Sequence, residues 1–144
     1  KNMGVTIESP NYSIDLGPAG FNRLRQKVAD LTATDIAEHY SKLTDGMFLV
    51  GDERQKFMAC YNKKIAELNA KYNEKYSNIL DFLYESDCSG KMDTEHCKSI
   101  WEIIKDYNDD ICYGYAGRSD CAKFSDFKDI VKDCIDKCVE MEWW

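Results

Sequence analysis

The longest regular feature of the chain is a helical pattern that covers residues 52–86 and contains neither glycine nor proline. Apolar side chains recur in it every three or four residues, the spacing of one face of an α-helix. They are Phe57, Tyr61, Ile65, Leu68, Tyr72, Tyr76, Ile79 and Leu83. A straight helix of this length would measure about 52 Å, whereas a compact domain of this size is about 35–40 Å wide. We therefore expect this helix either to bend between Asn69 and Asn73 or to protrude, and its tyrosine-rich face either to join the core or to mediate a dimer.

Shorter helical patterns flank the central one. Pro18 stands where helices commonly begin and is followed by apolar residues at helical spacing. Thr32 or Thr34 can cap a second helix, and Thr94 and Ser125 can cap two more. No run of alternating apolar and polar residues is long enough to indicate a strand. The sequence therefore predicts an all-α fold, a disulfide-stabilised helical bundle of about five helices with one long central helix.

The patterns also suggest how the chain is divided. Residues 1–17 lack sustained periodicity and are expected to form an extended N-terminal arm or a short surface strand. Residues 18–144 are expected to form a single helical domain, because a chain of 144 residues has the size of one ordinary domain. Within it, segments 88–109 and 112–138 are interpreted as two copies of a loop-plus-helix unit, since each begins with two cysteines at the same spacing.

Seven cysteines are many for a chain of 144 residues, and such a number is typical of secreted proteins with disulfides. Cys88 and Cys97 enclose eight residues, and Cys112 and Cys121 enclose eight more. We expect each of these two pairs to form a local disulfide.

Cys60, Cys134 and Cys138 remain. Cys134 and Cys138 share one face of the last predicted helix, a geometry that favours two separate partners. One of them is expected to bond Cys60 and tie the last helix to the central one. The seventh cysteine is then free or joined to another chain, which would give a disulfide-linked dimer. We expect no metal site, because the chain has no C-x-x-C pair and only two histidines.

Charge and hydropathy exclude several classes of partner. The chain has 26 acidic and 19 basic residues, a net charge of −7. This sign disfavours nucleic acid, whose phosphates need cations, and anionic lipid surfaces. No apolar run is long enough to span a bilayer. No signal-type apolar stretch is present, so we expect a mature secreted protein whose targeting segment was removed. The sequon Asn11-Tyr12-Ser13 agrees with secretion.

No catalytic constellation is visible. The run Asp110-Ile111-Cys112-Tyr113-Gly114 resembles the active-site helix of secreted phospholipases A2. Asp109 stands where that family has its catalytic histidine, and a carboxylate is too weak a base for the role. His39 and His96 have no partner that spacing implies. We therefore expect no enzymatic activity and no cofactor.

Cysteine–tyrosine pairs occur at Cys60-Tyr61 and at Cys112-Tyr113, each followed by further cysteines. Over residues 57–138 the acidic, tyrosine-rich and cysteine-rich chain resembles the small secreted effector and salivary proteins of insects and parasites, among them the aphid BICYCLE effectors. The resemblance implies a secreted protein delivered into a host, and it carries over no catalytic residues.

Four aromatic residues are the candidate binding anchors. Tyr113 and Tyr115 lie in a loop whose ends a disulfide would clamp, and Trp143 and Trp144 end a polar segment. Tryptophan and tyrosine dominate binding hot spots. We therefore expect a secreted, non-enzymatic effector or interaction protein that binds a host or extracellular protein.

The alternative is a carrier of a small hydrophobic ligand within the helical bundle. Aromatic residues on several predicted helices would line its cavity: Tyr72, Tyr76, Phe82, Trp101 and Phe127. A closed cavity of more than about 300 Å³ would favour this function.

Overall fold

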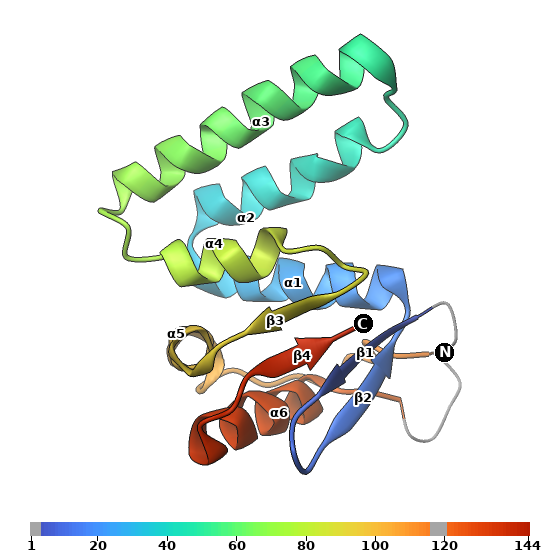
Figure 1. Cartoon of the computed structure of the whole chain (residues 1–144), viewed down its shortest axis with the longest axis vertical. Coiled ribbons are helices and arrows are strands. Elements are labelled where there is room, and N and C mark those ends of the chain that lie inside the picture. Colours follow the sequence, from blue (N-terminus) through green and yellow to red (C-terminus); the bar gives the residue numbers. More distant parts are fainter. Residues whose placement is uncertain (1–3, 116–120) are drawn as a thin grey trace.

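The structure is a computed structural model that describes residues 4–115 and 121–144. Within these ranges it has six α-helices, one short 3₁₀ helix and a four-stranded sheet (Figure 1). The predicted all-α class is therefore wrong, because the protein is mixed α/β. Along its long axis the sheet and α6 (Phe124–Lys137) lie towards one end and α3 (Gly51–Lys71) lies at the other.

The sheet joins segments from both ends of the described chain. Its strands are β1 (Val5–Glu8), β2 (Ser13–Leu16), β3 (Gly90–Met92) and β4 (Met141–Trp143), in the antiparallel order β2-β1-β4-β3. Ile7 of β1 lies opposite Trp143 of β4, and both side chains are buried. The segment expected to be an extended arm or a short surface strand thus supplies two strands and part of the core.

The carboxylate of Asp133 on α6 holds the turn between β1 and β2. It accepts hydrogen bonds from Ser9 Oγ at 2.8 Å and from the backbone N–H and Nδ2 of Asn11 at 2.8 and 2.9 Å. The sequon asparagine therefore uses its amide nitrogen to fix the hairpin against the helix.

Most predicted helices are present. They are α1 (Pro18–Thr32), α2 (Thr34–Ser41), η1 (Lys42–Gly46), α5 (Thr94–Ile104) and α6. Pro18 opens α1 as expected, and α2 begins at Thr34. The cap of α5 lies one residue earlier than predicted, because Asp93 accepts a hydrogen bond from the backbone N–H of His96.

The central helix is broken close to Asn69–Asn73, the region where a bend was one of the two expectations. It ends at Lys71 and resumes as α4 (Ser77–Tyr84). Asn73 and Glu74 adopt left-handed φ angles of 54° and 63° in the intervening turn, a conformation that no helix continues through. The break returns α4 to the core and leaves α3 packed mainly on α2 and η1, with only Tyr61 and Leu68 buried along its length.

An aromatic cluster forms the centre of the core where α1, α4, α6 and β4 meet. Phe82 lies 6.4 Å from Phe21, 5.8 Å from Phe127 and 5.9 Å from Trp143, measured between ring centres. Phe82 and Phe127 were expected to line a ligand cavity, and they fill the core instead.

The disulfide between Cys112 and Cys121 is confirmed, with its Cα atoms 5.8 Å apart. The other five cysteines are thiols. The predicted Cys88–Cys97 bridge is wrong, because Cys97 lies on the buried face of α5 while Cys88 is exposed in the preceding loop.

The predicted bridge from Cys60 to the last helix is also wrong. Cys60 is exposed on α3, whereas Cys134 is buried on α6 at the opposite end of the long axis (Figure 1). Cys138 is exposed at the end of α6, the helix that lies opposite α3 along that axis. Among the helices in the described ranges, none is long and apolar enough to cross a membrane.

Candidate functional site

The most exposed apolar segment of the described chain connects η1 to α3. Phe48 is 90% exposed, Val50 78% and Met47 59%. We call these three residues the apolar tip. Other exposed large apolar residues are single ones spread over the surface, and scattered residues of this kind are normal. Three in four consecutive positions at the end of a helical hairpin instead indicate an interaction surface.

Two glycines bracket the apolar tip and give it a defined shape. A Cβ on Gly46 would come within 2.4 Å of the Phe57 ring, so only glycine allows α3 to pack against η1 here. Gly51 has a φ of 57°, in the left-handed region that glycine adopts without strain. Backbone hydrogen bonds from Met47 to Thr44 (3.1 Å) and from Leu49 to Gly46 (3.2 Å) close the turn.

Exposed carboxylates flank the apolar tip along the chain. Asp45 precedes it, and Asp52 and Glu53 follow it in the first turn of α3, where the helix dipole favours negative charge. The nearest arginine in the sequence, Arg54, donates from Nη1 to the carbonyl oxygen of Gly46 at 3.2 Å. The tip is thus an apolar projection with an acidic border.

An open groove runs from the apolar tip along the space between α1 and α3. Its outer part has a volume of about 580 Å³ and its inner part about 320 Å³. The two parts share Pro18, Asn22, Leu43, Met58 and Asp87 as lining residues, so they form one continuous hollow.

Arg25 lies at the floor of the inner groove and is only 5% exposed. Its guanidinium carbon is 4.1 Å from the ring centre of Phe21, 5.6 Å from Phe82 and 5.4 Å from Trp143. Burial lowers the pKa of Arg25, and the adjacent Tyr40 hydroxyl partly offsets this effect. Nε and Nη2 find no oxygen acceptor among the described residues. The guanidinium contacts the faces of these aromatic rings instead, so Arg25 is part of the packed core.

Two tyrosines, one on α3 and one on α4, hold α3 to its neighbours. The Tyr61 hydroxyl donates to the carbonyl oxygen of His39 and lies 3.0 Å from the Tyr84 hydroxyl. The His39 ring stacks on the Tyr61 ring at 3.8 Å. Burial raises the pKa of Tyr84 to about 12 and lowers the pKa of His39. These groups stay neutral near pH 7 and serve packing.

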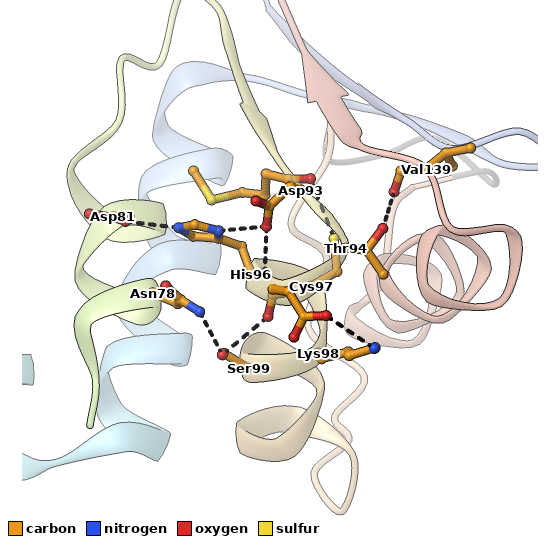
Figure 2. A network of polar contacts seen from close by, with 11 residues as sticks. Asn78, Asp81, Asp93, Thr94, His96, Cys97, Lys98, Ser99 and Val139 are labelled. Atoms are coloured by element: carbon orange, nitrogen blue, oxygen red, sulfur yellow. Dashed lines mark hydrogen bonds and ion pairs between the residues drawn. The ribbon is translucent and has the colours of Figure 1, made fainter. Parts of the chain in front are cut away.

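His96 joins α4 to the beginning of α5. Figure 2 shows its ring between two carboxylates, with Nδ1 2.7 Å from Asp93 and Nε2 2.8 Å from Asp81. Partial burial alone would lower the pKa of His96, but the two carboxylates outweigh it and raise that pKa. The hydrogen bond from the backbone N–H of His96, together with the contact with its ring, lowers the pKa of Asp93. Both ring nitrogens are therefore occupied by a structural contact between two helices.

The four predicted anchors do not form one surface. Trp143 and Tyr113 are 1% and 2% exposed, and the Tyr113 hydroxyl donates to Asp109 at 2.8 Å. Tyr115 is half-buried. Trp144 is partly exposed, and its backbone pairs with Thr6. Two of the four are thus core residues, because β4 and the backbone around Tyr113 place these two side chains inward.

No protein family, curated protein or solved structure matches the chain.

The apolar tip was visible in the sequence as an apolar run between two glycines, Gly46 and Gly51. Exposure depends on whether a neighbouring element covers the segment, and the sequence pattern holds no sign of that.

Proposed function

We propose that the protein is a secreted, non-enzymatic interaction protein that binds a host or extracellular protein through the apolar tip. The observation that carries the proposal is the 90% exposure of Phe48 within a cluster of three exposed apolar side chains. Large aromatic side chains that enter a partner's pocket supply much of the energy of protein interfaces. The Cys112–Cys121 disulfide supports secretion.

The border of the tip defines the chemistry of the partner. Asp45, Asp52 and Glu53 would face the rim of a pocket that receives Phe48. With a net charge of −7, the protein favours a partner whose apolar pocket has a basic rim. The same carboxylates oppose insertion into an anionic membrane.

Site-specific photo-crosslinking tests this assignment. The photoreactive residue p-benzoylphenylalanine replaces Phe48 in one sample and Tyr12 in the control. Tyr12 is also an exposed aromatic residue, but it lies in the turn between β1 and β2. After incubation in the extracellular fluid of the source, we expect a discrete adduct at position 48 that position 12 does not form. Equal adducts at both positions, or adducts with lipid alone, would contradict the proposal.

The second candidate function is the carriage of a small hydrophobic ligand. The observation that favours it is the groove between α1 and α3, which has the volume of a ligand site although it is open. Met58 lines both parts of the groove, and the neighbouring Ala59 is exposed. If the groove binds ligands, Met58→Trp should abolish the fluorescence of bound 1-anilinonaphthalene-8-sulfonate while Ala59→Trp preserves it. Equal fluorescence in both variants would exclude the groove as the site.

A further inference from the structure

Two of the five thiols lie together in the core. Cys97 faces inward from α5 and Cys134 faces inward from α6, and neither side chain is exposed. These two helices pack closely against each other. The pair lies beside the sheet, because the Cys97 thiol donates to the carbonyl oxygen of Met92 in β3 at 3.6 Å and also contacts the backbone of Met141 in β4.

The two thiols are neighbours in this packed region. Interaction with Cys134, together with burial, raises the pKa of Cys97, while interaction with Cys97 lowers the pKa of Cys134. A thiolate in contact with a second cysteine is the arrangement from which disulfide exchange proceeds.

We propose that Cys97 and Cys134 form a second disulfide of the secreted protein, which joins α5 to α6. The oxidant is a low-molecular-weight disulfide of the glutathione type or a disulfide oxidoreductase. During folding, the thiolate of one of the two cysteines attacks the oxidant and expels one thiolate, which leaves a mixed disulfide on that cysteine. The thiolate of the other cysteine then attacks the protein sulfur of the mixed disulfide and expels the second. Two protein thiols thus lose two electrons and two protons, and the oxidant gains them as two thiols.

This pairing is nested around the one already present. Cys112 and Cys121 lie in the connection between α5 and α6, so the proposed bond closes a larger loop that contains the smaller one. The remaining three cysteines, Cys60, Cys88 and Cys138, are exposed. They lie on α3, in the loop before β3 and at the end of α6. Among the described residues, Cys97 and Cys134 are the two buried thiols, and each is the other's neighbour.

Burial determines when the bond can form. An oxidant cannot reach two side chains with no exposed surface in the folded protein, so oxidation must accompany folding. After folding, the same burial protects the bond from reductants. We therefore expect it to resist dithiothreitol in the native state and to be reduced once the protein is unfolded.

Peptide mapping tests the proposal on the full, unsubstituted chain, because trypsin places all seven cysteines on separate peptides. The protein is secreted from a eukaryotic host, alkylated under denaturing conditions without reductant, and digested. We expect peptide 92–98 joined to peptide 133–137, and alkylation of Cys60, Cys88 and Cys138. Alkylation of both Cys97 and Cys134, or a bond from either one to another cysteine, would overturn the proposal.

A variant pair gives a second, independent measurement. Cys97→Ala/Cys134→Ala removes the proposed bond, and Cys60→Ala/Cys138→Ala removes two exposed thiols as the control. Reductant present during unfolding should lower the melting temperature of the control by more than it lowers that of the Cys97/Cys134 variant, because only the control retains both disulfides. Equal shifts in the two variants would contradict a second disulfide.

Discussion

The ring of Phe57 lies against Gly46 so closely that a Cβ on the glycine would approach the ring carbon Cε2 to 2.4 Å. Through this contact the first turns of α3 are fixed to η1, and the four residues after Gly46 are left at the end of the hairpin. Phe48, at this end of the hairpin, is 90% exposed.

Gly46→Ala should destabilise the protein by about 1–3 kcal/mol, because the Phe57 ring must leave its position. Chemical denaturation followed by circular dichroism measures the change. Gly51→Ala is the matched comparison, since nothing lies within 4 Å of its Cβ position. Its cost should be about 1–2 kcal/mol and should arise from the left-handed φ alone. An unaffected Gly46→Ala variant would show that the Phe57 contact does not fix α3.

Trp143→Ala should cost about 3–5 kcal/mol of stability, because the buried ring packs against Phe21 and Phe82. Its indole N–H also donates to the carbonyl oxygen of Ser86 at 2.8 Å. Trp144→Ala should cost much less, about 1 kcal/mol or below, since that side chain is partly exposed whereas Trp143 is buried. Equal effects in urea denaturation would contradict the assignment of Trp143 to the core.

The contribution of His96 to stability should decrease as pH rises. Contacts with Asp81 and Asp93 raise the folded-state pKa of His96 above its unfolded value of about 6.5. The stabilisation is therefore complete below about pH 6.5 and is lost as pH rises through the higher folded-state pKa. Its size should be about 0.5–1 kcal/mol, because both carboxylates are exposed to solvent.

The difference in unfolding free energy between the wild type and His96→Gln isolates this effect at pH 5.5 and pH 8.5. His39 acts in the opposite sense: burial lowers its pKa, so its protonation in the unfolded state reduces stability as pH falls. That effect is common to both proteins and cancels in the difference. A gap that widens at pH 8.5 would refute the proposed role of His96.

The helices could be predicted because their apolar residues repeat over many positions, whereas the sheet could not. Its strands have three or four residues each, too few for alternation to be recognised. Met141 and Trp143 do alternate with exposed Glu142. However, the partners of β4 lie far away in the sequence, at β1 and β3, and no local pattern identifies them.

The cysteine pairs show a similar limit. Equal spacing correctly predicted Cys112–Cys121, because a short loop brings those residues together. The same rule failed for Cys97, since the helical periodicity of α5 turns its side chain towards α6. Loop spacing predicts that Cys97 pairs with Cys88, whereas the helical periodicity of α5 places Cys97 on the apolar face of the helix. In the structure that face is buried, so Cys97 is buried while Cys88 is exposed.

The affinity of the partner recovered by crosslinking, measured by isothermal titration calorimetry with purified proteins, tests the central claim most directly. Phe48→Ala should weaken binding by about 10- to 100-fold, or ~1.4–2.7 kcal/mol. It should leave the melting temperature unchanged, because the side chain is 90% exposed. Tyr12→Ala should bind as the wild type does. Unchanged affinity of Phe48→Ala for that partner would contradict the apolar tip as the binding surface.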